Sequence, residues 1–357
     1  MLGLATLREL FKHNDWARDK LLALTNDLSN DQLDQPFEMG PGSLRATLFH
    51  LWACEFGWLR RWQPASDRGY ADEPAGESID EMRRRFIETA AERDAFMAGL
   101  TEADGGRRIT YQRRDGGTST FPLGDMILHV TNHGVHHRAQ ALNMLRHLGA
   151  KKLPGLDYLF MRGERPTLPL SAEMIAMWKE RGFNLSDKPE PPVAFDLDTV
   201  REYFRFSDWA TRYVHGLAVE LSDEQLDREF EIGMGTLRKT LIHIHDAEAW
   251  WYNYWIEKPR PNIDLSKAMT MSELRDRIGE SNERRDAFLD TCSADDLLRP
   301  MTIEPSPGHK MNFRLGQTVM QLPGHGTHHR AQAINMLRRF GVALKDVDYL
   351  DWYRETN

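Results

Sequence analysis

Histidine is the residue type whose spacing in this chain most directly suggests chemistry. The sequence contains 14 histidines. His133 and His137 are four residues apart, which on a helix places them on adjacent turns of one face, about 40° apart around the axis. Neutral imidazole rings at this spacing are good ligands for zinc, nickel, copper or iron. The pair therefore predicts part of a transition-metal site.

The metal hypothesis depends on repetition, because a His-x-x-x-His pair alone is common. Histidines occupy matching positions in two similar halves of the chain: His50/His243, His133/His325, His136/His328 and His137/His329. His50 lies in an apolar stretch and is the expected third ligand. Three protein ligands with an open position are typical of catalytic zinc. The alternative, buried histidines satisfied by hydrogen bonds, accounts less well for three at ligand spacing in both halves.

The spacing leaves the roles of His136 and His328 open. Each follows the first histidine of its pair by three residues, which on a helix is about 60° to its other side. Each could replace the second histidine as a ligand, support a ligand by hydrogen bonding, or act as a general base. These two residues are therefore candidates for catalysis without an assigned function.

The histidines recur because the chain contains an internal repeat. The segment from Leu7 to His50 aligns without a gap to the segment that begins at Val200. One residue is then lost, and HGVHHRAQALNMLR at His133 matches HGTHHRAQAINMLR at His325. A period this long indicates two whole domains. We expect domains at residues 1–161 and 194–357, joined by a linker at 162–193. The linker should contain a short helix from Ser171 and a stiff proline-rich stretch.

Helices are expected to position the histidines, since apolar residues recur at helical spacing over residues 7–24. The other elements expected in the first repeat are a turn at 29–32, a helix from the N-cap Ser43 to Trp62, a loop at 64–76, a helix from Ser78 to Leu100, a short hairpin within 105–121, and a helix over Leu123–His147 closed by Gly149. Thr236 repeats the role of Ser43. The pattern predicts an all-α protein of two tandem four-helix bundles.

Composition excludes several other classes. The chain has 357 residues, 41% of them hydrophobic, and a formal net charge of -8 without a basic patch, so nucleic-acid binding is not expected. No apolar run approaches the roughly 20 residues that span a membrane, and the first residues do not resemble a signal peptide. Cys54 and Cys292 occupy non-equivalent places, which fits a reducing cytoplasm. We expect a cytoplasmic protein with a small-molecule substrate.

Both halves resemble one known family. LFHLWACEFGW from Leu48 and HVTNHGVHHRAQALNMLRHLG from His129, with LIHIHDAEAWW from Leu241 and QLPGHGTHHRAQAINMLRRFG from Gln321, are similar to the DinB-like (YfiT-type) metalloproteins. The resemblance covers both halves nearly end to end. It implies a four-helix bundle with three metal ligands in each half: His50, His133 and His137, then His243, His325 and His329. Relatives often form homodimers, which implies a monomer whose two halves pack as a pseudo-dimer.

The resemblance implies a reaction class but not one reaction. Some relatives are thiol S-transferases or thiol-dependent isomerases, and others are described as hydrolases. The implied cofactor is a divalent transition metal, zinc or nickel before iron or manganese, with a low-molecular-weight thiol for thiol chemistry because the retained pattern has no cysteine. The alternative is a non-catalytic metal-binding or interaction protein. Arg138 and Arg330 are further candidates, for an anionic substrate or for salt bridges to Glu55 and Glu248.

Two departures distinguish the halves. Pro323 and Gly324 stand just before His325, where the first half has Thr131 and Asn132. Proline removes a helical hydrogen bond, so the last long helix of the second half is expected to begin later or to kink, which could displace His325. In addition, Cys54 lies one turn after His50, where the second half has alanine. It is either a fourth ligand, an oxidation-sensitive thiol or a small buried residue, and the last is favoured.

Overall fold

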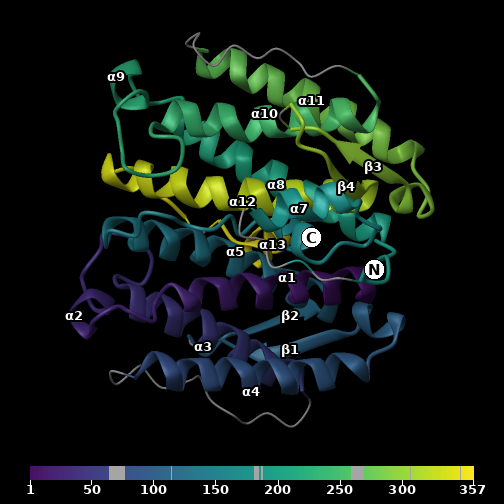
Figure 1. Ribbon diagram of the computed structural model, residues 1–357. Helices are drawn as coiled ribbons and strands as arrows, with labels where there is room; N and C mark the ends of the chain where they lie inside the picture. The colour runs from purple at the N-terminus through teal and green to yellow at the C-terminus, as the bar shows by residue number, and fades with distance from the viewer. Residues whose placement is uncertain are drawn as a thin grey trace. The chain divides into compact units, whose positions relative to one another are not determined.

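The computed structural model describes residues 1–63, 77–113, 115–180, 185, 188–258, 269–305, 307–345 and 347–357. The chain divides into two compact units, which are Met1–Pro154 with Lys345–Asn357, and Gly155–Leu344. Both units are mostly helical (Figure 1). The loop expected at residues 64–76 lies outside the described residues.

The first unit is a helical bundle built around one long helix. Its elements are α1 (Leu4–Ala23), α2 (Asn30–Leu33), α3 (Leu44–Trp62), α4 (Ile79–Ala98), the 3-10 helix η1 (Glu102–Gly106), β1 (Arg108–Gln112), β2 (Thr118–Pro122), α5 (Leu123–His147) and α13 (Tyr349–Thr356). Helices α1 and α3 pack against α5, and α4 packs against both α1 and α3. The faces that meet are apolar: Leu7, Leu48 and Met126 are fully buried.

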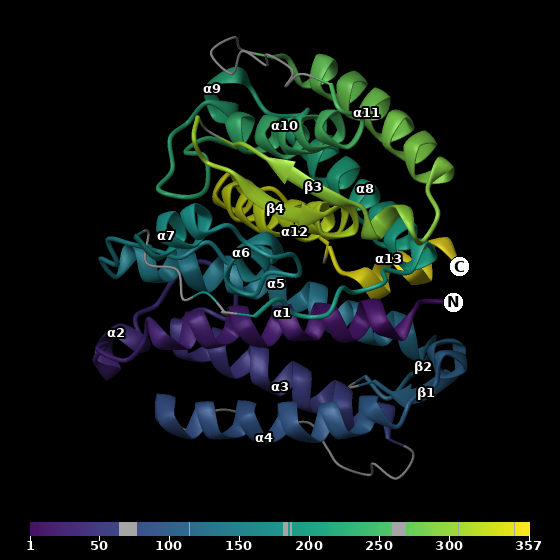
Figure 2. The same ribbon diagram turned by 45° about the vertical axis from the view of Figure 1, so that its right-hand side comes forward.

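The second unit repeats this plan. Its elements are α6 (Tyr158–Glu164), α7 (Ala172–Glu180), α8 (Leu197–Ala218), α9 (Asp223–Leu226), α10 (Leu237–Trp255), α11 (Met271–Thr291), the 3-10 helix η2 (Asp296–Leu298), β3 (Pro300–Ile303), β4 (Met311–Arg314) and α12 (Leu315–Arg339). Figure 2 shows the antiparallel hairpin β3–β4 leading into α12, which α8 and α10 contact. The predicted all-α architecture of two tandem bundles is confirmed.

Local sequence signals explain where the long helices begin and end. The side chain of Ser43 accepts a hydrogen bond from the backbone N–H of Ala46, and Thr236 caps α10 in the same way. Gly149 follows α5 with a φ of +92°, the left-handed conformation that favours glycine after a helix. The expected hairpin and the short helix after Ser171 are also present. The turn expected at residues 29–32 is instead the short helix α2, because Ser29 forms a capping box with Gln32.

The prediction that the last long helix would begin later because of Pro323 is wrong. Helix α12 begins at Leu315, the counterpart of Leu123, and continues through Pro323 to Arg339. The proline lacks one backbone donor, but α12 is packed against α8, α10 and α6. Burial of its apolar face, including Val319 and Leu322, outweighs the loss of one hydrogen bond. His325 therefore keeps its helical position.

The ends of the two sequence repeats are exchanged between the units. An Asp-Tyr-Leu motif closes each repeat, at residues 157–159 and 348–350. The predicted boundaries 1–161 and 194–357 assign each motif to its own repeat. In the structure, α13 from the second repeat packs on α5 of the first unit, and α6 from the first repeat packs on α12. The Tyr349 hydroxyl donates to Asp125 at 2.7 Å, and the Leu159 N–H donates to Gln321 at 3.1 Å. Each unit therefore contains a tail that belongs by sequence to the other repeat.

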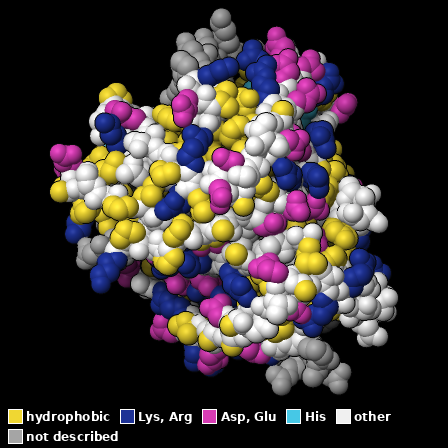
Figure 3. Space-filling view, turned by 90° about the vertical axis from the view of Figure 1, so that its right-hand side faces the viewer, with side chains coloured by type: hydrophobic (Ala, Val, Ile, Leu, Met, Phe, Trp, Pro, Cys, Tyr) yellow, Lys and Arg dark blue, Asp and Glu magenta, His cyan; other side chains and the backbone are white. Residues whose placement is uncertain are grey.

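The charges on the surface and the character of the helices can be compared with the composition of the chain. On the face in Figure 3, basic and acidic side chains are interspersed among hydrophobic ones. Among the described residues, none of the helices combines the length and apolar character needed to cross a membrane.

Candidate metal centres

Three histidines converge in the first unit. His50 comes from the middle of α3, and His133 and His137 come from adjacent turns of α5. The Nε2 atom of His133 lies 3.2 Å from Nε2 of His50 and 3.1 Å from Nε2 of His137. The three residues form a group whose ligand atoms lie within 4.8 Å of one another. The structure thus brings together the three residues that the sequence singled out.

The second unit contains a matching group on matching helices. His243 comes from α10, and His325 and His329 come from α12. The Nε2 atoms of His325 and His243 are 3.2 Å apart, and the ring of His329 lies 4.5 Å from each of the other two rings, between centroids. All three are part of a group whose ligand atoms lie within 4.8 Å. The proline before His325 does not disturb this arrangement.

The spacing of the donor atoms fits a bound metal ion. A tetrahedral ion at zinc–nitrogen distances of about 2.0–2.1 Å holds its nitrogen ligands about 3.4 Å apart. The Nε2 distances of 3.1 and 3.2 Å are close to this value. Each of these nitrogens carries either one N–H or one lone pair, and where neighbouring nitrogens are both unprotonated their lone pairs repel each other. A cation placed between them would resolve that repulsion. Metal binding by these residues stays a prediction.

The electrostatic environment keeps four of these rings neutral, which is the form that binds metals. Burial, together with the neighbouring histidines, lowers the pKa of His133 to about 3 and that of His243 to about 4. Burial and the adjacent rings also lower the pKa of His137 and His329 well below the ordinary value. A neutral ring keeps one lone pair for a metal, so less proton competition opposes binding at neutral pH.

A glutamine in each unit orients one histidine of the group. The Nδ1–H of His137 donates to Oε1 of Gln140 at 2.7 Å, and Nε2 of Gln140 donates to Nε2 of His136 at 3.0 Å. In the second unit, His329, Gln332 and His328 repeat these bonds at 2.8 and 3.0 Å. A donor at Nδ1 leaves the lone pair of His137 on Nε2, toward the other rings.

These bonds favour one of the roles left open for His136 and His328. A neutral imidazole has one N–H and one lone pair. The lone pair on Nε2 of His136 accepts from Gln140, so His136 supports the glutamine that orients His137. It does not belong to the three-histidine group. The contacts therefore favour a supporting role over that of ligand or general base.

A glycine makes room for each glutamine. Gly40 lies in the loop before α3 with a φ of +53°, and a Cβ atom there would lie 2.5 Å from Oε1 of Gln140. Gly233 has a φ of +54° and would place a Cβ atom against Oε1 of Gln332. A side chain at either position would be strained by its backbone and would push the glutamine from its histidine.

The exchanged tails bring an aspartate to each group, and the two aspartates make different contacts. The Nδ1 atom of His325 lies 3.0 Å from Oδ2 of Asp157 in a hydrogen bond. In the first unit, Oδ1 of Asp348 lies 2.9 Å from Nδ1 of His129, close enough for an ion pair but poorly aligned for a hydrogen bond. His129 has Gln321 as its counterpart. Sequence reasoning missed both aspartates.

Cys54 lies beside the first group. Its Sγ atom is 3.6 Å from Nε2 of His50 and 3.9 Å from Nε2 of His133. It is not part of the group whose ligand atoms all lie within 4.8 Å, which means that it does not converge on one point with His137. The geometry therefore does not make Cys54 a fourth ligand, and it leaves a thiol in contact with two expected ligands.

The arginines that follow the histidine pairs in both repeats point into the helical core. Arg138 is 3% exposed and donates to Asn14 of α1, while Arg330 is 2% exposed and donates to Ser207 and Thr211 of α8. A dissolved anionic substrate has no ready access to side chains this deeply buried. The expected salt bridges to Glu55 and Glu248 are made instead by Arg93 and Arg285, at 3.6 and 3.5 Å.

Two helical bundles, each with three converging histidines, define a tandem bundle protein with two candidate metal centres. The family model of the DinB family matches residues 1–167 and 196–356. The chain therefore belongs to the DinB family, in two tandem copies, and the resemblance is confirmed. The protein DinB of Bacillus subtilis (strain 168) is 23% identical over 163 residues, which cover 43% of this chain and 93% of that protein. No solved structure shows a significant match to the chain.

Proposed function

We propose that this protein is a divalent-metal-dependent enzyme that uses one three-histidine centre in each unit. The observation that carries the proposal is the convergence of three imidazole nitrogens in both units. Two pairs of Nε2 atoms are 3.1 and 3.2 Å apart in the first unit, and one pair is 3.2 Å apart in the second. The donor set of neutral imidazoles favours zinc or nickel, with iron or manganese as alternatives. A bound ion would lower the pKa of a coordinated water or thiol, or polarise a substrate oxygen.

The protein's own residues would hold and orient this centre. Gln140 fixes the ring of His137, and Gln332 fixes the ring of His329. Asp157 holds His325 in the second unit. Each of these bonds uses Nδ1 and directs Nε2 toward the shared point, which is the arrangement that raises ligand affinity at catalytic metal sites.

An enzyme is favoured over a purely structural metal site by the number of ligands. Each group has three histidines without a fourth donor among the described residues, whereas structural zinc sites have four protein ligands. The rings also remain partly accessible, since the side chain of His325 is 14% exposed. The reaction classes that we propose, from the resemblance to the family, are S-transfer or isomerisation with an external low-molecular-weight thiol, and hydrolysis by water.

Elemental analysis of protein purified after expression in zinc- or nickel-supplemented medium tests the proposal. We expect one equivalent of metal per centre, and the loss of one equivalent in each of the variants His50→Ala and His243→Ala. His245→Ala is the matched control, because His245 is two residues from His243 on α10 and outside the group. It should retain the metal.

Activity separates the enzyme from the structural alternative. The metal-loaded protein is assayed for transfer of a small thiol to an aryl chloride and for hydrolysis of an activated ester, and each ligand variant should lose activity with its metal. Protein that binds less than half an equivalent in total, with no change in His50→Ala, would refute the proposal. Full metal content that raises the melting temperature, without an exchangeable water or thiol at the ion, would support the structural alternative.

A further inference from the structure

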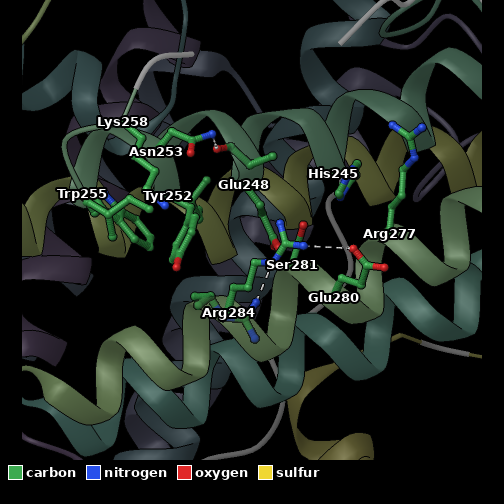
Figure 4. A pocket seen from close by; sticks show the side chains of 14 residues that line it. His245, Glu248, Tyr252, Asn253, Trp255, Lys258, Arg277, Glu280, Ser281 and Arg284 are labelled. Atoms are coloured by element: carbon green, nitrogen blue, oxygen red, sulfur yellow. Dashed lines mark hydrogen bonds and ion pairs between the residues drawn. The ribbon is translucent and has the colours of Figure 1, made fainter. Parts of the chain in front are cut away.

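A cavity of about 420 Å³ lies between α10 and α11 in the second unit (Figure 4). His245 and Arg277 line one end of it, Tyr252 and Lys258 line the other, and Ser281 lies between them. His243 and His245 are two residues apart on α10, which turns their side chains about 200° from each other around the helix. The cavity is therefore separate from the histidine group, which faces α12.

The first unit explains why the second unit has this cavity. At the matching place, Trp52 of α3 stacks on Phe56, with ring centroids 5.2 Å apart and an interplanar angle of 26°. Trp52 is only 6% exposed. The counterparts of these two aromatic residues are His245 and Ala249. Two large rings are thus replaced by one smaller ring and a methyl group, which leaves space of aromatic size.

The groups that contact the Trp52 ring are retained in the second unit. In the first unit, the indole N–H of Trp52 donates to the hydroxyl of Thr89 at 3.0 Å, and the guanidinium of Arg85 lies 4.7 Å from the ring centroid. Their counterparts, Ser281 and Arg277, both line the cavity. The second unit therefore keeps a hydrogen-bond acceptor and a cation for a planar ring that the chain itself no longer supplies.

His245 provides an independent indication of a ligand. Its side chain is 95% buried, since only 5% of the residue is exposed. Its Nδ1 atom has no hydrogen-bond partner among the described residues. A buried polar atom without a partner costs roughly 1–3 kcal/mol, and such atoms in native proteins generally have a functional explanation. This atom exposes less than 1 Å² of surface, so a ligand would become its partner only after the imidazole ring turns toward the cavity.

The charges of the lining indicate an anionic group. Arg284 pairs with Glu280 at 3.1 Å, and Arg285 pairs with Asp208 at 2.6 Å. In the part of the chain that the structure describes, the side chains of Arg277 and Lys258 form no ion pair. The cavity thus has a cation near each end that forms no ion pair among the described residues, and the carboxylate of Glu273 interacts with Arg277 only electrostatically.

We propose that this cavity binds a small planar aromatic acid. Its ring occupies the space that Trp52 and Phe56 fill in the first unit, where Ser281 can exchange a hydrogen bond with it. Its carboxylate pairs with Arg277 or, in a longer molecule, with Lys258. The volume of about 420 Å³ is within the range of small-molecule sites. This site is additional to the metal centres and does not depend on them.

Isothermal titration of the full-length, metal-loaded protein with indole-3-acetate tests the proposal. This probe carries both an N–H ring and a carboxylate. We expect binding at one site, weaker binding of indole, and no binding of acetate. Arg277→Gln should weaken indole-3-acetate binding by about tenfold, as expected for the loss of a charged hydrogen-bond partner. The matched variant Arg85→Gln, in the first unit, should leave it unchanged.

A second variant fills the cavity with the residues of the first unit. The double substitution His245→Trp and Ala249→Phe should abolish binding of indole-3-acetate, raise the melting temperature and leave the metal content unchanged. No binding of indole-3-acetate by the wild-type protein would overturn the proposal. So would binding that is equal in Arg277→Gln, or equal in a filled variant that retains its metal. Arg277 is exposed, so its substitution tests the site even where the filled variant does not fold.

Discussion

Asp157 offers the sharpest test of how the second centre is built. Its Oδ2 atom accepts a hydrogen bond from Nδ1 of His325 at 3.0 Å. Burial alone would raise the pKa of Asp157, but the charge and hydrogen bond of His325 lower it below its usual range, so Asp157 is ionised at neutral pH. Asp157 is the N-cap residue of α6 but makes no side-chain capping bond. Its replacement therefore removes the histidine contact without removing a cap.

The expected magnitude follows from this geometry. The side chains of His325 and Asp157 are 14% and 23% exposed, so the interaction is only partly screened by solvent. Loss of a carboxylate that orients a metal-binding histidine costs about 10–100-fold in metal affinity, or about 1.4–2.7 kcal/mol. Asp157→Asn keeps an acceptor of the same shape and should lie near the tenfold end. Asp157→Ala removes the acceptor and should lie near the hundredfold end.

The assay must report the second centre alone. His133→Gln removes the first centre, and competition for zinc with a chromophoric chelator then measures the dissociation constant of the second. The matched control is Asp348→Asn, measured in protein that carries His325→Gln. Asp348 lies against His129 instead of an expected ligand, so its substitution should change the affinity of the first centre less. Affinity of the second centre within about twofold of wild type in both Asp157 variants would refute the reasoning.

Three further predictions follow from the site geometry. Burial lowers the pKa of His133 to about 3, so below about pH 6.5 only the unfolded chain takes up a proton at this residue. The contribution of His133 to the free energy of unfolding of the metal-free protein should therefore fall by about 2 kcal/mol between pH 7 and pH 5. Urea midpoints that rise on acidification would contradict this. Gly40→Ala should destabilise the protein by about 1 kcal/mol or more and weaken metal binding at the first centre, because the φ of Gly40 is +53° and an added Cβ would meet Gln140. The control is Gly216→Ala, in a helix with open space around it, which should be neutral or stabilising in the same melting experiment. Cys54→Ala should leave the metal content unchanged and the cobalt-substituted wild-type protein should show no thiolate charge-transfer band, because Sγ lies outside the histidine group; loss of metal from Cys54→Ala would establish it as a ligand.

Local signals in the sequence predicted much of this structure. Caps at Ser43 and Thr236, helical periodicity and the glycine after α5 are short-range features, so the long helices and the hairpin of the first repeat could be placed without coordinates. The histidine groups could be predicted because each needs only one pair on one helix and a third residue on its neighbour. The repeat then supplied an independent second example.

The remaining features depend on long-range packing, which spacing does not encode. Pro323 is a helix breaker by local rules, but α12 is buried on several sides and continues through it. Asp157 meets His325 across 168 positions of the chain, and its motif gives no sign of which unit it joins. The role of Gln140 was missed for a different reason, since only its geometry shows that it bonds both His136 and His137.

The tandem arrangement allows the two centres to diverge separately. In a dimer of identical chains, one substitution changes both sites, so neither can be altered while the other is preserved. Here each difference affects one unit: Cys54 lies beside only the first group, and His129 takes the tail aspartate only in the first unit. The second unit has His245 in place of Trp52 and contains a cavity that His245 lines. Both histidine groups are retained although their surroundings differ. This is expected if the two centres carry out the same chemistry in different surroundings.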